Sequence, residues 1–310
     1  MDLKAISKIG LELFYIMIGG LMLSTAIIIL KDKAHKTRIG STLFWAILAL
    51  IFMFGAIIPA EIVGIMLLVI GVLTVTKQVN IGTLKDLNVT FANEQSKKLR
   101  NKVFIPSVSI AVIALVVAQG FKDLGGSFAI GFSAVVSIII TFVVIKAKPQ
   151  EFVEDSNRML QSIGATAILP QLLAALGTLF TAAGVGDVIA NLISNIVPDG
   201  NILFGVIAYC LGMAIFTMIM GNAFAAFSVI TAGIGLPFVF AQGANVVIAS
   251  ALALTAGYCG TLLTPMGANF NIMPSALLEI EDKNKIIKHQ APVAIVLLFI
   301  HILLMYFLAF

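Results

Sequence analysis

Near its C-terminal end, the chain combines residue types that can build a transport site inside a membrane. The stretch reads GYCGTLLTPMGANFNIMP over residues 257–274. Gly and Pro at this density break a helix, which frees backbone carbonyl and N–H groups. In secondary transporters, the N-termini of such half-helices attract an anionic substrate group, and the freed carbonyls coordinate a cation. The candidate substrate-binding residues of this stretch are Gly260, Thr261, Thr264, Pro265, Gly267, Asn269 and Asn271.

The backbone of this stretch is expected to form a discontinuous span. Pro265 lacks a backbone donor and disfavours helical geometry at Thr264. Each polar backbone group left unpaired at membrane depth would cost roughly 2–7 kcal/mol, so broken backbone is tolerated only where it lines protein or a watery cavity. The predicted elements are a helix to about Tyr258, an unwound segment near 260–272 and a short helix from Pro274 to Glu279.

A second break is expected in the sequence GNAFAAF, residues 221–227. Asn222 is suited to cap a helix running from Ala223 to Thr231, which would leave free N–H groups beside Gly221. Gly221 and Asn222 therefore join the candidate residues, and the two breaks could face each other to form one small site. Close packing of helices is the alternative interpretation, because small residues also let helix backbones approach each other.

Motifs of soluble enzymes are absent from the sequence. It contains no GxSxG, P-loop, HExxH or GxGxxG motif, and His35, His289 and His301 are scattered along the chain. We therefore expect neither an enzyme nor a cofactor, and no metal cluster can be assigned. Residues 200–278 carry no charged side chain. An anionic substrate there would be neutralised by helix ends, by a coupling ion such as Na⁺ or H⁺, or by another polypeptide.

Composition excludes a soluble protein. The 310 residues are 60% apolar and only 11% charged, with a mean hydropathy of +1.09, whereas soluble domains carry about 25% charged residues. Disordered chains are polar and are excluded by the same values. Nucleic acid is not an expected partner, because the basic residues lie in short loops between apolar runs. The composition predicts an all-α, polytopic protein in contact with the lipid bilayer.

About ten membrane segments are expected, some of them broken or re-entrant in the C-terminal half. A helix crosses the hydrocarbon in roughly 20 residues. Apolar runs of about that size fall at 11–30, 39–58, 62–76, 103–121, 126–145, 159–183, 200–220, 222–240, 243–260 and 290–309. Whether residues 221–241 are re-entrant or span the membrane is left open by the pattern.

Basic residues predict the orientation and the division of the chain. Most of the 19 Lys and Arg residues lie in the loops 31–38, 77–102 and 146–158, which alternating spans would place on one side. By the positive-inside rule that side is cytoplasmic and the N-terminus lies outside. The expected regions are a five-span region 1–145, a cytoplasmic linker 146–158 and a transporter-like region with discontinuous helices 159–310.

The loop 77–102 ends in the basic sequence KKLRNK, residues 97–102. A cytoplasmic helical hairpin or a surface helix is expected there. Its basic end either contacts anionic lipid headgroups or is a solvated charged loop.

Three motifs carry a resemblance to a known family. AGVGDVIANLIS, GNAFAAFSVITAGIGLP and GYCGTLLTPMGANFNIMPSALLE resemble a multi-pass family of the bacterial inner membrane that forms one of two subunits of a pyroglutamate (5-oxoproline) transporter. More weakly, the C-terminal half resembles one repeat of the ion transporter superfamily, which includes gluconate, citrate and dicarboxylate permeases. In that superfamily the turn Gly221–Asn222 and the break Thr264–Asn269 would correspond to the substrate and cation loops.

The resemblance implies a function and a partner. We expect a subunit of a secondary permease, driven by an ion gradient, for pyroglutamate or a related small carboxylate. Because residues 1–145 lack a matching pair of polar breaks, a second membrane subunit would supply the other repeat. A non-transporting membrane scaffold, with the breaks used only for packing, is the alternative.

Overall fold

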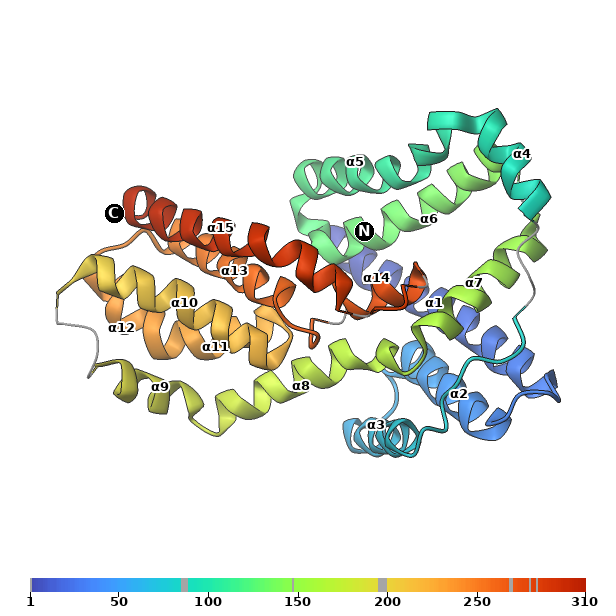
Figure 1. Cartoon of the computed structure of the whole chain (residues 1–310), viewed down its shortest axis with the longest axis horizontal. Coiled ribbons are helices and arrows are strands. Elements are labelled where there is room, and N and C mark those ends of the chain that lie inside the picture. Colours follow the sequence, from blue (N-terminus) through green and yellow to red (C-terminus); the bar gives the residue numbers. More distant parts are fainter. Residues whose placement is uncertain are drawn as a thin grey trace. The chain divides into compact units, whose positions relative to one another are not determined.

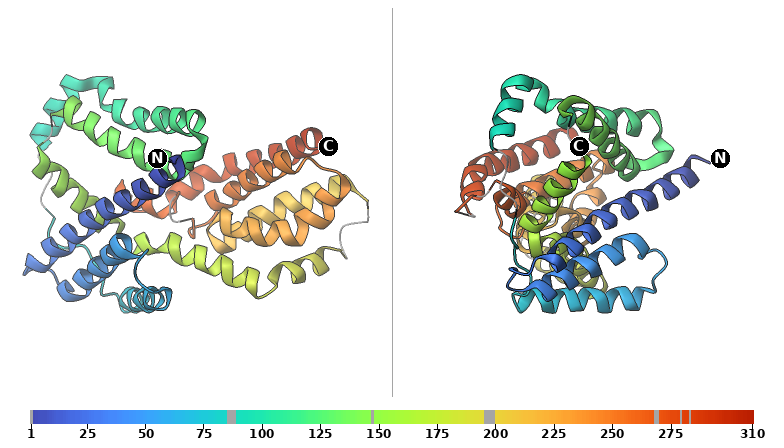
Figure 2. Two further views of the ribbon diagram at one scale, coloured as in Figure 1. Left: turned by 180° about the vertical axis from the view of Figure 1, so that it is seen from behind. Right: turned by 90° about the vertical axis from the view of Figure 1, so that its right-hand side faces the viewer.

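The computed structural model describes residues 2–84, 89–146, 148–194, 200–267, 270–278, 280–282 and 284–310. Within these ranges the regular structure is helical and contains no strand. The chain forms two compact units, Met1–Gly164 and Ala165–Phe310. Figures 1 and 2 show the helices of both units, and each unit is described separately. The all-α class predicted from the sequence is confirmed.

The first unit contains seven α-helices among its described residues. They are α1 (Leu3–Lys31), α2 (Arg38–Phe54), α3 (Ala60–Val75), α4 (Val89–Leu99), α5 (Ile105–Gly120), α6 (Gly125–Ile145) and α7 (Pro149–Ile163). Short 3-10 turns, η1 (Arg100–Phe104) and η2 (Lys122–Leu124), precede α5 and α6. α7 covers most of the predicted linker 146–158 and packs on α1 within this unit.

The core of the first unit lies between α1 and α2. Its largest fully buried side chains include Ile29, Phe44, Trp45, Leu48 and Ile70. The rings of Phe44 and Trp45 pack edge to face, with centroids 5.2 Å apart. Such aromatic pairs add to the apolar burial that drives helix association.

The segment after α3 packs on the end of α1 and on the last turn of α7. The Asp32 carboxylate, at the end of α1, accepts a hydrogen bond from the Thr83 N–H at 2.8 Å. The Gln161 Oε1 atom of α7 accepts one from the Gly82 N–H at 2.9 Å. These contacts bring the segment after α3 against both α1 and α7. The contact between residues 32 and 83 brings the loops 31–38 and 77–102 together. That all three basic loops share one side of the membrane, and that this side is cytoplasmic, stays a prediction.

The second unit is built from α-helices interrupted by other turns. Its elements are α8 (Leu169–Ala182), α9 (Val185–Ser194), α10 (Ile202–Met220), α11 (Ala223–Ile230), the π-helix η4 (Thr231–Gly235), α12 (Leu236–Phe238), η5 (Phe240–Gln242), α13 (Val246–Leu262), α14 (Ile272–Leu277) and α15 (Lys285–Leu308). α10, α11, α13 and α15 pack together around a core that includes Tyr209, Met213 and Met305. α13 contributes the small buried residues Ala249, Ala253, Ala256, Gly257 and Gly260, which permit close backbone approach.

Among the described residues, six helices are long and apolar enough to cross a membrane. One further candidate is a pair of helical segments bent by 65°, Ala175–Ala182 and Val185–Ser194. α2, α3 and α13 are apolar but contain only 17, 16 and 17 residues, which is about 25 Å at 1.5 Å per residue and shorter than a hydrocarbon core of about 30 Å. A membrane-embedded helical protein is thus supported, but the predicted count of about ten spans is not confirmed.

The helix boundaries around the candidate site differ slightly from the prediction. α13 continues to Leu262 rather than ending near Tyr258, and α14 begins at Ile272. Pro274 is the third residue of α14, where a missing N–H costs little because the first turn has no intrahelical acceptors. Glu279, the predicted end of this helix, lies outside the described residues. The discontinuous character of the segment is as expected.

Candidate functional site

The turn between α10 and α11 requires glycine for two reasons. Gly221 has a φ of +69°, a left-handed conformation that side chains disfavour. Its N–H donates to the Thr217 carbonyl at 2.6 Å, which closes the end of α10. A Cβ atom at residue 221 would also overlap the Met266 carbonyl group. Since Met266 belongs to the second break, the two predicted breaks lie against each other.

Asn222 caps α11 as predicted. Its side-chain Oδ1 accepts hydrogen bonds from the N–H groups of Phe224 at 2.9 Å and Ala225 at 3.2 Å. The cap satisfies two of the N–H groups that a bound anion would otherwise use. The positive end of the α11 dipole still points toward the Gly221 turn. α11 ends at Ile230 and continues into the π-helix from Thr231.

The second break is a sequence of tight turns between α13 and α14. The Thr264 carbonyl accepts from the Gly267 N–H at 3.1 Å, and the Gly267 carbonyl accepts from the Asn271 N–H at 3.0 Å. Pro265 occupies the second position of the first turn, where its restricted φ is favourable. The Thr264 hydroxyl accepts from the Met266 N–H at 3.2 Å. The described residues of the break are therefore held by local hydrogen bonds.

Asn271 clamps the end of α13. Its side-chain amide nitrogen donates to the carbonyls of Thr261 at 3.0 Å and Thr264 at 2.7 Å. These are two of the carbonyls that the break frees, so they already have a partner within the chain. Because both acceptors are carbonyls, the nitrogen must face them.

Two buried oxygen atoms near the breaks lack a hydrogen-bond partner among the described residues. They are Oδ1 of Asn271 and Oγ1 of Thr217, and both residues have an exposed fraction of 0%. A buried acceptor without a donor costs about 1–3 kcal/mol. Either oxygen could be satisfied by a cation or by a donor group of a ligand.

Three of the candidate residues make contacts within the helical framework. A Cβ atom at Gly260 would overlap the Ala214 carbonyl of α10, so Gly260 permits close contact of α10 with α13. The Thr261 hydroxyl donates to the Gly257 carbonyl within α13 at 3.3 Å. Gly267 likewise packs on the Thr261 carbonyl. Asn269 lies outside the described residues.

Three aromatic rings at the breaks were not among the predicted site residues. Tyr258 lies with its ring centroid 6.0 Å from that of Phe224 and 6.0 Å from that of Phe270. The three rings connect α11, α13 and the second break. Tyr258 and Phe270 belong to the stretch 257–274, but aromatic residues beside apolar ones carry no sequence signal of a site. Thr217 was also missed, because a single Thr in an apolar run carries no sequence signal.

No metal centre is formed by the side chains that the structure describes. These residues include no group of three His, Cys, Asp or Glu side chains that could hold a metal ion. The three histidines instead bond to backbone carbonyls, those of Asn80 at 3.0 Å, Lys285 at 2.8 Å and Leu297 at 2.6 Å.

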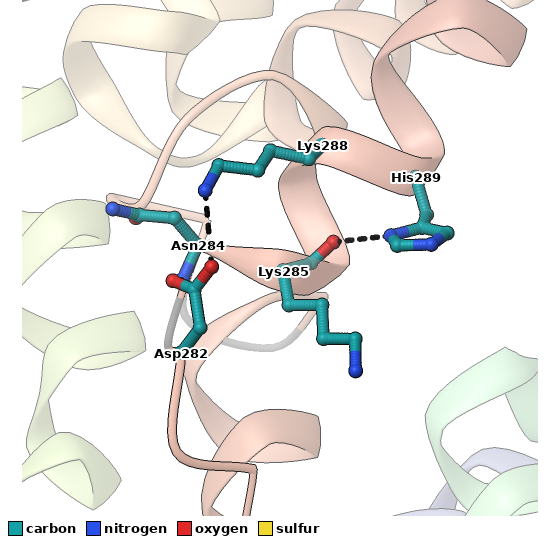
Figure 3. Close-up of polar contacts among 5 residues, drawn as sticks. All are labelled: Asp282, Asn284, Lys285, Lys288 and His289. Atoms are coloured by element: carbon teal, nitrogen blue, oxygen red, sulfur yellow. Dashed lines mark hydrogen bonds and ion pairs between the residues drawn. The ribbon is translucent and has the colours of Figure 1, made fainter.

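Charged side chains reappear beyond α14, at the start of α15 (Figure 3). The Lys288 ammonium group lies 3.0 Å from the Asp282 carboxylate, and the Asn284 N–H donates to the same carboxylate at 3.0 Å. The hydrogen bond from Lys288, followed by that from Asn284, lowers the pKa of Asp282. This polar cluster lies just beyond the uncharged stretch 200–278.

Comparison with known proteins gives a family for almost the whole chain. No curated protein and no solved structure matches the sequence. One family profile matches residues 12–310, which cover most of the first unit, the whole second unit and both breaks. The chain therefore belongs to the family described as Protein of unknown function (DUF979).

Proposed function

We propose that this chain is a subunit of a secondary permease that moves a small organic acid by alternating access. The observation that carries the proposal is the contact of the Gly221 turn with the Met266 carbonyl. This contact joins two helix interruptions within the uncharged stretch 200–278 of the second unit. Interrupted helices that meet at membrane depth are the usual framework of a transporter site.

The class of substrate follows from the chemistry of the two breaks. The N-terminus of α11 supplies a positive dipole end, which favours a carboxylate. The uncharged residues 200–278 contain no side-chain cation that would hold an anion permanently. The resemblance of the three motifs to a pyroglutamate transporter subunit supports pyroglutamate or a related carboxylate as the substrate.

Na⁺ and H⁺ remain the two candidate coupling ions. Residues 200–278 contain no Asp, Glu or His, so a proton would have to travel on the substrate or on groups elsewhere. The unpartnered buried oxygens of Asn271 and Thr217 are ligand types that Na⁺ accepts. The lack of a proton acceptor and the presence of these oxygens therefore favour Na⁺ over H⁺ as the coupling ion bound by the second unit.

A non-transporting scaffold is the second candidate. The contacts of Gly260 with the Ala214 carbonyl and of Gly257 with Met213 are those of close helix packing, which a scaffold would also need. A scaffold would use the Asn222 cap only to stabilise α11, whereas a permease would also need it to hold the positive end of α11 at the break. The two candidates therefore differ in how they depend on Asn222.

Two asparagine caps allow a matched test. Asn222 caps α11, and Asn245 caps α13 by accepting from the N–H groups of Val247 at 3.1 Å and Ile248 at 3.2 Å. Replacing either residue by Ala removes a cap worth about 1 kcal/mol. Uptake of labelled pyroglutamate into vesicles that contain the complex should fall at least tenfold for Asn222→Ala and less than twofold for Asn245→Ala. Equal effects of the two substitutions would favour the scaffold.

The proposal includes a second membrane subunit. This chain alone, reconstituted in liposomes, should not take up substrate, because one repeat forms only half of the expected site. Robust uptake by the single chain would refute the need for a second subunit and leave the site assignment intact.

A further inference from the structure

The α5–α6 pair of the first unit ends in a group of exposed basic side chains. Four of them lie in the last turn of α4 and in η1, and the fifth directly follows the last residue of α6. These residues, called the basic end below, are Lys97, Lys98, Arg100, Lys102 and Lys146. Each of them is exposed.

The fold brings both parts of the basic end to the same end of the α5–α6 pair. α5 and α6 are joined by the short turn η2, so they run antiparallel, and the start of α5 lies beside the later part of α6. The Ser137 hydroxyl of α6 donates to the Pro106 carbonyl of α5 at 2.8 Å, which fixes this alignment. Figures 1 and 2 both show α4 near the end of α6.

Few carboxylates of the same unit neutralise the charges of the basic end. Among the residues that the structure describes, none of its five side chains forms an ion pair or a hydrogen bond with a carboxylate. Glu94 lies one turn before Lys98 and is itself exposed. Glu151 accepts instead from the Lys148 backbone N–H at 2.7 Å. A cluster of cations without counter-charges attracts a polyanionic surface.

Large apolar side chains follow the cations directly. Val103, Phe104 and Ile105 have exposed fractions of 44%, 63% and 43%. They lead into α5, which belongs to a candidate span, Asn93–Gly120. The chain therefore passes from cations to apolar side chains at the point where a spanning helix would leave the headgroup region.

We propose that the basic end binds the phosphodiester headgroups of anionic phospholipids, with Phe104 against the upper part of the acyl chains. The attraction comes from several cations within a Debye length of the lipid surface, and each contributes about a fivefold gain in affinity. Apolar side chains beside the cations favour a lipid over a soluble polyanion, because a nucleotide or an acidic protein segment would leave Phe104 and Val103 in water.

Binding can be measured with the full-length chain in nanodiscs of equal amounts of phosphatidylglycerol and phosphatidylcholine. Native mass spectrometry then gives the ratio of the two lipids that remain bound after release from the disc. The unmodified chain should retain phosphatidylglycerol over phosphatidylcholine at least tenfold. In the combined variant K97Q/K98Q/R100Q/K102Q, the ratio of retained phosphatidylglycerol to phosphatidylcholine should be at least tenfold lower than in the unmodified chain.

Two control variants separate a site from a general charge effect. K4Q/K8Q/K122Q removes basic residues that the predicted topology places on the opposite side, and it should keep the preference. K97R/K98R/K102R keeps the charges and should also keep it. Circular dichroism establishes that each variant is folded before its lipids are compared.

Three results would overturn the proposal. They are equal retention of both lipids by the unmodified chain, equal loss of preference in the K4Q/K8Q/K122Q control, and displacement of phosphatidylglycerol by the same concentration of inorganic phosphate. The last result would show a phosphate site rather than a lipid site. Because lipid retention is measured without transport, a negative result leaves the permease proposal untouched.

Discussion

Gly221 and Met266 touch through their backbones, although they are far apart in the sequence and belong to different helix interruptions. The contact leaves no room for a side chain at residue 221. It also places the capped N-terminus of α11 beside the turns that follow α13. This pair of residues therefore holds the candidate site together.

Replacing Gly221 by Ala should destabilise the second unit by about 2–4 kcal/mol, because the new Cβ adds an unfavourable φ to an overlap with the Met266 carbonyl. Gly243 provides a matched control. It has a φ of +96° and nothing within 4 Å of an added Cβ, so Gly243→Ala should cost only about 1 kcal/mol. Thermal unfolding of both variants in detergent measures the difference. Equal melting temperatures would show that the contact with Met266 is not tight.

Replacing Asn271 by Asp should be more harmful than replacing it by Ala. Ala removes two hydrogen bonds and leaves two carbonyls unsatisfied, at a cost of about 2–5 kcal/mol. Asp adds a buried acceptor that faces the carbonyls of Thr261 and Thr264, and it must bind a proton or disrupt the turn. Thr261→Val is the control, since it removes a single hydrogen bond of 3.3 Å. An Asp variant as stable as the unmodified protein would contradict the role of the Asn271 side chain in bonding to the Thr261 and Thr264 carbonyls.

Substitutions at the second break test transport directly. In the reconstituted complex, Thr264→Val and Asn269→Ala should abolish uptake while the two subunits still assemble. The Val side chain keeps the shape of Thr264 but cannot accept from the Met266 N–H. Uptake is measured with labelled substrate and assembly by size-exclusion chromatography. Normal transport by both variants would show that the site lies elsewhere.

The stability of the first unit should depend on pH through Asp32. The hydrogen bond from the Thr83 N–H stabilises the carboxylate and lowers the pKa of Asp32 in the folded state. A lowered folded pKa contributes stability above the ordinary pKa of Asp, and that stability is lost as the pH falls through the folded value. The melting temperature of the unmodified chain should therefore fall more steeply than that of Asp32→Asn between about pH 5 and pH 3. Identical pH profiles would contradict this role.

Local interactions were readable from the sequence. Asn222 was predicted to cap a helix beginning at Ala223, and it does, because an N-cap depends only on residues two and three positions away. Pro265 and Gly267 likewise predicted a break, because Pro and Gly restrict or release the backbone wherever they stand. Apolar composition determined the helical, membrane-embedded class, since lipid leaves backbone groups no partner except one another.

Long-range contacts were decided only by the tertiary structure. The overlap between residue 221 and the Met266 carbonyl depends on how α10, α11 and α13 pack, and the sequence does not encode that in any local spacing. The donation from Asn271 to Thr261 and Thr264 depends on the path of the chain between them. The predicted number of about ten spans is likewise not confirmed, because apolar runs do not reveal where a helix ends. Composition and capping act over a few residues, whereas a site made of two breaks exists only once distant segments have packed against each other.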